Sequence, residues 1–95
     1  MMKIEQLIQR PGIFKIPVEF HKNNPSKVME ICSEVLITKA RFKDNSYFYE
    51  GYSERFEEAP SIITQHLPIY DLKINEDGSH EFNLNMLKTG YPKII

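Results

Sequence analysis

The chain has 95 residues, of which 41% are hydrophobic and 26% charged, with 12 basic and 13 acidic side chains. This composition excludes a disordered chain, and the length leaves room for one hydrophobic core, so we expect a single domain over residues 1–95. The net charge of −1 argues against a general affinity for nucleic acid or anionic membranes, because both require a basic excess.

Cys32 is the only cysteine, so an intramolecular disulfide cannot form. The first residues lack the apolar run of a secretory signal, because Glu5 falls where that run would begin. No apolar stretch of the sequence is long enough to span a bilayer. We therefore expect a cytoplasmic protein without a membrane segment.

Two short elements are predicted before residue 21. Apolar residues at helical spacing predict a helix over residues 2–9, which the Pro11-Gly12 pair ends. Alternating apolar and polar residues then predict a strand over 13–20 with one apolar face. Because Pro17 has no N–H to donate, this strand is expected at a sheet edge.

A second helix is predicted over residues 25–34. Asn24 followed by Pro25 is typical of an N-cap and a first helical residue. The apolar side chains that follow have helical spacing: Val28, Ile31, Cys32 and Val35. Because a helix between two strands can act as a crossover, we expect the strands before and after it to be parallel neighbours.

A first hairpin is predicted from strands at 36–42 and 47–52. Its turn is placed at Asp44-Asn45, because both residue types tolerate left-handed backbone geometry. The resulting register makes three cross-strand pairs: Phe42 with Tyr47, Ala40 with Tyr49, and Lys39 with Glu50. Strict alternation assigns Leu36 to the core face of this hairpin and Ile37 to the opposite face.

A second hairpin is predicted from strands at 69–74 and 80–84. A two-residue turn at Asp77-Gly78 would mix the apolar and polar faces of the two strands. A three-residue loop with Gly78 in the left-handed conformation instead matches like with like. The pairs are then Leu72 with Phe82, Tyr70 with Leu84, and Lys73 with Glu81.

These elements predict an α+β fold, with a mostly antiparallel sheet of about five strands and one or two helices packed on one face. A helical turn around residues 54–58 is expected in the connection between the hairpins.

The sequence contains no recognisable catalytic, cofactor-binding or metal-binding pattern. His21, His66 and His80 lack the spacing of zinc ligands. Cys32 falls near the end of a predicted helix on its apolar stripe, where a thiol behaves as a small hydrophobe. No glycine-rich phosphate loop or nucleophile elbow is present. We therefore expect a protein that is not an enzyme and that uses neither a cofactor nor a metal.

Two surfaces are candidate interfaces. The first is a sheet face that mixes aromatic and charged side chains, a composition found in binding hot spots. If a predicted helix covers this face, it belongs to the core instead. The second is a solvated acidic loop suited to a basic partner. Their residues are Ile37, Arg41, Phe48 and Tyr52 for the face, and Glu54, Glu57 and Glu58 for the loop.

One stretch resembles a group of small uncharacterised phage and prophage proteins. It runs Tyr47-Phe48-Tyr49-Glu50-Gly51-Tyr52-Ser53-Glu54-Arg55-Phe56-Glu57-Glu58-Ala59-Pro60, followed by Leu67-Pro68-Ile69-Tyr70. In that pattern a strand ends in serine, a phenylalanine and two acidic residues precede a proline, and a second proline opens the next strand. Ala59 departs from it, since an aliphatic residue is more usual there. The resemblance implies an accessory gene of a phage or prophage.

The resulting functional hypothesis is a small binding protein, such as a phage-type accessory or anti-defence factor that blocks a bacterial host protein by steric or competitive binding. One alternative is a homo-oligomer that encloses a small, nucleotide-like ligand between subunits. Another is a structural or assembly component of a virion.

Overall fold

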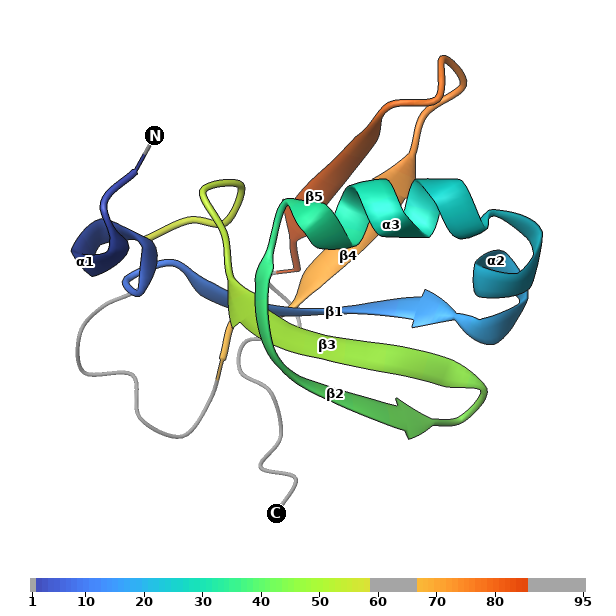
Figure 1. Ribbon diagram of the computed structural model, residues 1–95, viewed down its shortest axis with the longest axis horizontal. Coiled ribbons are helices and arrows are strands. Elements are labelled where there is room, and N and C mark those ends of the chain that lie inside the picture. Colours follow the sequence, from blue (N-terminus) through green and yellow to red (C-terminus); the bar gives the residue numbers. More distant parts are fainter. Residues whose placement is uncertain (1, 59–66, 86–95) are drawn as a thin grey trace.

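The computed structural model describes residues 2–58 and 67–85. Its elements are, in chain order, α1 (Ile4–Leu7), β1 (Pro11–Pro17), α2 (Val18–Asn23), α3 (Pro25–Ser33), β2 (Leu36–Lys43), β3 (Ser46–Tyr52), β4 (Tyr70–Ile74) and β5 (His80–Leu84) (Figure 1). The prediction of an α+β fold is confirmed, with five antiparallel strands divided between two sheets.

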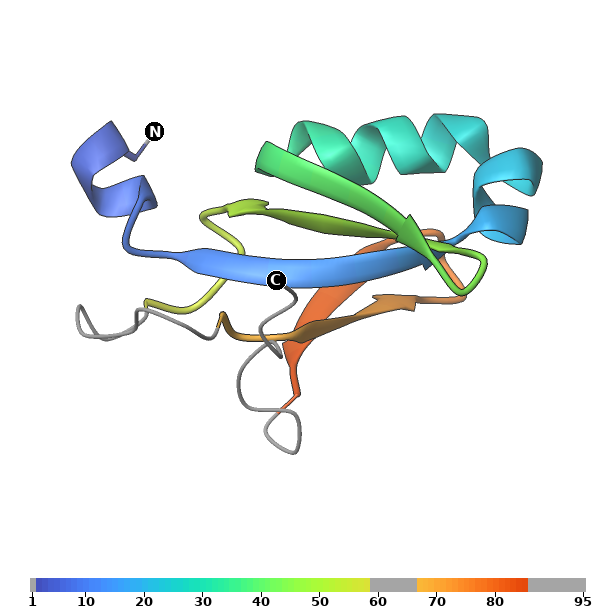
Figure 2. The same ribbon diagram turned by 90° about the horizontal axis from the view of Figure 1, so that it is seen from below.

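The strands form a three-stranded sheet in the order β1-β3-β2 and a separate β4-β5 hairpin. A parallel bridge between Ile13 and Ile69 joins them, and the Ile13 N–H donates to the Pro68 carbonyl over 2.9 Å. Figure 2 shows α2 and α3 on the same side of the three-stranded sheet. The expectation that β1 and β2 are neighbours is wrong, because β3 turns back from β2 and pairs with both of them.

The strand predicted over 13–20 ends at Pro17, where α2 begins. Pro17 does lie in an edge strand of the three-stranded sheet, as expected. The Val18 N–H donates to the Asn45 carbonyl of the β2–β3 turn over 2.9 Å, which satisfies one free donor at the start of α2. The helix predicted over 2–9 is also shorter than expected, since α1 covers only four residues.

The β2–β3 register is as predicted between residues 39 and 50, but a β-bulge lies between Ile37 and Lys39. Thr38 is the extra residue, so the two residues before it exchange faces. Ile37 pairs with Gly51 and packs against the core, whereas Leu36 pairs with Tyr52 and is 47% exposed. The assignments of Ile37 to the outer face and Leu36 to the core face are therefore wrong.

The turn of this hairpin has the predicted left-handed geometry, with φ of 53° at Asp44 and 59° at Asn45. We expect Asn45→Ala to lower the free energy of unfolding by about 1 kcal/mol, because alanine pays the steric cost of that conformation. Asn45→Gly should leave stability unchanged or raise it. Urea unfolding followed by circular dichroism checks both variants, and equal losses would contradict the backbone explanation.

The second hairpin confirms the predicted three-residue loop and all three predicted pairs. Gly78 has a φ of 92°, which only glycine adopts without strain. Both the N–H and the hydroxyl of Ser79 donate to the Asp77 carboxylate, and these hydrogen bonds lower the pKa of Asp77. No helix forms at 54–58; instead the Phe56 N–H closes a turn on the Ser53 carbonyl over 3.1 Å.

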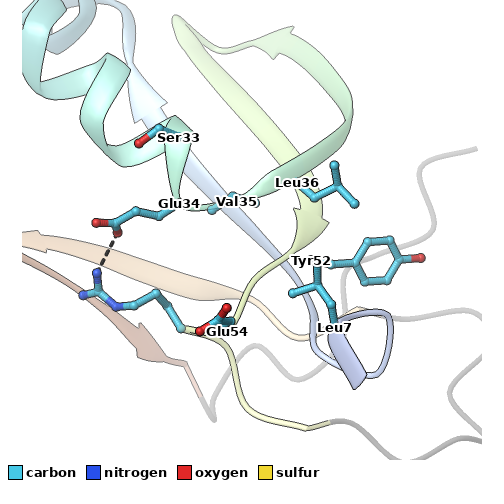
Figure 3. Close-up of a pocket in the computed structure, with 8 residues that line it drawn as sticks. Leu7, Ser33, Glu34, Val35, Leu36, Tyr52 and Glu54 are labelled. Atoms are coloured by element: carbon cyan, nitrogen blue, oxygen red, sulfur yellow. Dashed lines mark hydrogen bonds and ion pairs between the residues drawn. The ribbon is translucent and has the colours of Figure 1, made fainter. Parts of the chain in front are cut away.

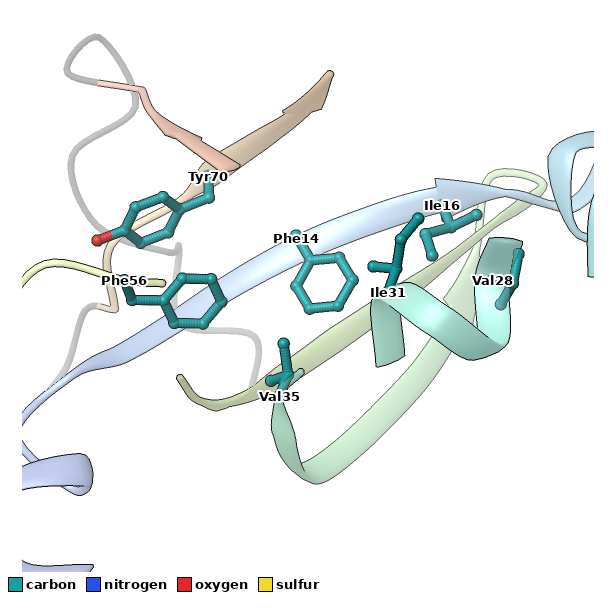
Figure 4. Packing of buried hydrophobic residues seen from close by; sticks show 7 residues of the cluster. All are labelled: Phe14, Ile16, Val28, Ile31, Val35, Phe56 and Tyr70. Atoms are coloured by element: carbon teal, nitrogen blue, oxygen red, sulfur yellow. The ribbon is translucent and has the colours of Figure 1, made fainter. Parts of the chain in front are cut away.

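The core lies between α3 and the two sheets. Phe14 lies at its centre, with the stacked rings of Phe56 and Tyr70 at one end and three aliphatic side chains at the other: Ile16, Val28 and Ile31 (Figure 4). The apolar face of β1 and the stripe of α3 thus meet as their periodicities predict. Within the described residues, no helix has the length and apolar character needed to cross a membrane.

Candidate functional site

A cleft of about 550 Å³ opens where the end of α3, the start of β2 and the end of β3 meet α1 (Figure 3). We call it the Leu36 cleft. Its lining residues are Leu7, Ser33, Glu34, Val35, Leu36, Tyr52, Glu54 and Arg55. The cleft therefore combines an apolar wall with two carboxylates and one guanidinium.

The apolar wall depends on the bulge in β2. Because Thr38 is the extra residue, Leu36 turns out of the core and lies beside its cross-strand partner Tyr52. Leu7 completes the wall from α1 (Figure 3). Ile4, three residues before Leu7 in α1, and Ile8, the residue that follows α1, are both more than half exposed. The apolar wall itself is therefore formed by Leu7, Leu36 and the ring of Tyr52.

The opposite wall is a hydrogen-bonded ionic network centred on Glu34. Its Oε1 accepts from the Arg55 guanidinium over 2.6 Å and from Nε2 of His80 over 2.7 Å. Arg55 also donates to the His80 carbonyl over 2.8 Å and lies 5.5 Å from the centre of the Phe82 ring. The network therefore ties α3 to β5 and holds the cleft's guanidinium in place.

A second set of contacts fixes the same hairpin to α3. Lys27 forms an ion pair with Glu30 over 3.3 Å and also donates to the Gly78 carbonyl at the β4–β5 loop. The His80 side chain is only 3% exposed, and its Nδ1 has no hydrogen-bond partner although Glu30 Oε2 lies 3.9 Å away. The imidazole is thus enclosed between the hairpin and α3.

The remaining reactive side chains lie away from the cleft. Burial raises the pKa of the Cys32 thiol, which disfavours the nucleophilic thiolate and fits the predicted role as a small hydrophobe. Burial also raises the pKa of Tyr49, whose hydroxyl lies 2.9 Å from Nε2 of His21. Across residues 2–58 and 67–85, no three His, Cys, Asp or Glu side chains gather closely enough to hold a metal ion.

The structure brings two of the predicted interface residues into the cleft, Tyr52 and Glu54. Arg41 and Phe48 form a cross-strand pair farther along the same sheet face, which is opposite the face that packs on α3. Neither α2 nor α3 covers that face, and Phe48 and Tyr52 are half-buried.

The acidic-loop residues Glu54, Glu57 and Glu58 are exposed, as predicted. The backbone N–H of Glu57 donates to the Tyr70 hydroxyl over 2.7 Å, which fixes the loop to the core while its carboxylates face solvent. Of the three histidines, His66 lies outside the described residues.

Sequence reasoning missed the rest of the cleft: Leu7, Ser33, Glu34, Val35, Leu36 and Arg55. The sequence placed the start of the 36–42 strand beside the end of the 47–52 strand, but the pair of Leu36 and Tyr52 arises from the bulge, which it did not predict. Comparison with protein-family models, with curated proteins and with solved structures found no match for this chain.

Proposed function

We propose that this chain is a small binding protein that acts by occupying a surface of a partner protein, with the Leu36 cleft as its contact site. The observation that carries the proposal is the outward turn of Leu36 beside Tyr52, which presents an apolar wall next to carboxylates. Apolar side chains at the centre of a polar rim are the usual anatomy of a protein interface.

The charges of the cleft favour a partner segment in which a basic residue follows an apolar side chain. Arg55 is already paired with Glu34, so the lining retains the exposed carboxylate of Glu54. Glu57 and Glu58 follow Glu54 in the same loop and extend the negative charge along it. A lysine or arginine of the partner would meet these carboxylates while the apolar side chain enters the cleft.

The resemblance to phage and prophage proteins supports a more specific proposal. On this view the chain is an accessory or anti-defence factor in the bacterial cytoplasm, and it blocks a host protein by steric or competitive binding. Glu34, Arg55 and His80 bind one another, so they are occupied in holding the fold. Blocking a partner requires only contact, which an apolar cleft with an acidic rim supplies.

The cleft volume also supports a second candidate function. About 550 Å³ lies within the range of small-molecule sites, as expected for a ligand-sequestering homo-oligomer. The lining charges disfavour a nucleotide, because its phosphates would meet Glu34 and Glu54 while Arg55 is engaged with Glu34. A small ligand of this cleft would more readily be neutral or cationic.

The test is capture of partners from nuclease-treated bacterial lysate with tagged wild-type chain, Leu36→Asp and Met29→Asp. Met29 is 74% exposed on α3 and does not line the cleft, so it provides a matched control. We expect one stoichiometric partner with wild type and Met29→Asp, and its loss with Leu36→Asp, because a buried carboxylate would cancel the apolar contact.

Thermal unfolding should show both variants folded before the capture results are compared. A partner retained by Leu36→Asp would show that the contact lies elsewhere. A lane containing only the tagged chain would favour the small-ligand function, which native mass spectrometry tests through added mass on the purified protein.

A further inference from the structure

The outer edge of β2 is a second candidate interface. It differs from the Leu36 cleft in that its charged side chains are basic. Among the described strands, β2 pairs only with β3, so its other edge carries no strand. Beyond the bulge, residues 39–43 continue in regular register to the turn. An extended segment can add to such an edge through main-chain hydrogen bonds.

The charged side chains of this edge all lie on one face. Lys39, Arg41 and Lys43 alternate along β2, and they pair with Glu50, Phe48 and Ser46 of β3. Residues two apart in a strand project from the same side of the sheet. Lys39 and Lys43 are exposed, so the edge presents a row of positive charge on the face opposite α3.

The other face of the same edge is apolar. Ala40 and Phe42 are exposed there, and the Phe42 ring is 55% exposed and lies 4.9 Å from that of Tyr47. A strand added to β2 would therefore meet cations on one face and an aromatic surface on the other. Its matching pattern is an acidic residue at every second position with apolar residues between.

These charges disfavour a second copy of the chain as the added strand. When β2 pairs with itself around a two-fold axis, each side chain faces one from the same side of the partner strand. Lys39, Arg41 and Lys43 would then face the same three cations across the pair. Like charges directly opposite one another destabilise a sheet, so this edge disfavours self-pairing.

We propose that the β2 edge, residues 39–43, binds an extended segment of alternating acidic and apolar residues from a partner protein by strand addition. The neighbouring strand already places one acidic residue in this way, because Glu50 is the cross-strand partner of Lys39. This surface is independent of the Leu36 cleft, and the two would contact segments of opposite charge.

The test uses a fluorescein-labelled peptide of eight alternating Glu and Val residues, titrated with the full chain and followed by fluorescence anisotropy. The control peptide has the same composition, with four Glu followed by four Val. We expect binding of the alternating peptide, weaker binding in high salt, and slower hydrogen exchange on saturation at those amides of 39–43 that point away from β3.

The variant Lys39→Glu/Lys43→Glu should bind the alternating peptide about tenfold more weakly, because two attractive cross-strand pairs become repulsive. The matched control Lys3→Glu/Lys22→Glu reverses the same number of charges at exposed sites off the sheet and should bind as wild type does. Circular dichroism verifies that both variants are folded.

Four results would overturn the proposal: no binding of the alternating peptide, equal binding of the block peptide, equal loss in the two variants, or binding without protection of the β2 amides. A wild-type dimer in sedimentation that Lys39→Glu/Lys43→Glu dissociates would also overturn it, in favour of a second copy at this edge.

Discussion

Replacing Phe56 with alanine is expected to lower the free energy of unfolding by about 3–5 kcal/mol, the usual cost of removing a large aromatic side chain from a core. The Phe56 ring is 1% exposed and stacks on that of Tyr70 with 4.4 Å between centroids. It also makes edge-to-face contacts with the rings of Phe82 and Phe14, with 5.3 Å and 6.4 Å between ring centroids. The cavity would therefore open where both sheets meet.

Chemical unfolding followed by circular dichroism measures this loss, with Phe42→Ala as the matched control. Phe42 is 55% exposed, so its truncation should cost less than about 1 kcal/mol. The Arg10 guanidinium donates to the Phe56 carbonyl over 2.6 Å, and this contact remains in Phe56→Ala. Similar losses in the two variants would show that Phe56 does not connect the sheets.

Glu34→Ala is expected to destabilise the fold by about 1–3 kcal/mol, the cost of leaving a buried hydrogen-bond donor without a partner. The His80 side chain is 3% exposed, and its Nε2 would lose its acceptor. Arg55 would lose its acceptor at the cleft wall as well. Because Arg55 and Glu34 are themselves partly exposed, solvent compensates part of that second loss.

Two control variants, Glu34→Gln and Glu30→Ala, distinguish the loss of the Glu34 network from the effect of removing any glutamate near α3. Glu34→Gln retains an acceptor oxygen and should lose less stability than Glu34→Ala. Glu30→Ala removes a glutamate whose side chain is 56% exposed in the same helix, so its cost should be smaller still. Equal losses for Glu34→Ala and Glu30→Ala in thermal unfolding would contradict the role assigned to Glu34.

The two hairpins were the most predictable part of the molecule, because their registers follow from side-chain identity alone. A one-residue slip in either hairpin would place apolar residues opposite polar ones, as Leu72 opposite Asn83 illustrates. The turn residues Asp44, Asn45 and Gly78 add an independent local signal, and all three have positive φ. Local chemistry and long-range packing therefore agree at these positions.

The bulge at Thr38 was not predictable from β2 alone, because the close strand approach beside it depends on a glycine of the neighbouring strand. A Cβ on Gly51 would lie 2.2 Å from the carbonyl oxygen of Leu36, so only glycine allows β2 and β3 to approach as they do. A prediction from strict alternation therefore assigned Leu36 and Ile37 each to the wrong face of the sheet. The predicted end of the first strand, at residue 20, was also wrong. Val18 and Phe20 continue the alternation of the strand, but they lie in the first turn of α2.

The cleft itself escaped sequence reasoning because its residues come from three distant segments. Tyr52 and Glu54 were identified by their chemistry, yet Glu34 and Arg55, which line the same cleft, had no pattern to distinguish them from solvated surface charges. The decisive contact joins α3 to β5 through His80, and no local propensity encodes it. Such contacts depend on the tertiary arrangement of the two sheets.

The position of β1 affects how the chain folds during synthesis. β1 pairs along its length with β3, and its other neighbour is Ile69, so both partners are translated after it. On the ribosome, α3 and the β2–β3 hairpin can form from contacts near in sequence, whereas β1 must wait for β3 to emerge. Until then its apolar residues Phe14 and Ile16 remain accessible to a chaperone, and the core is complete only when Tyr70 of β4, translated later still, has joined them.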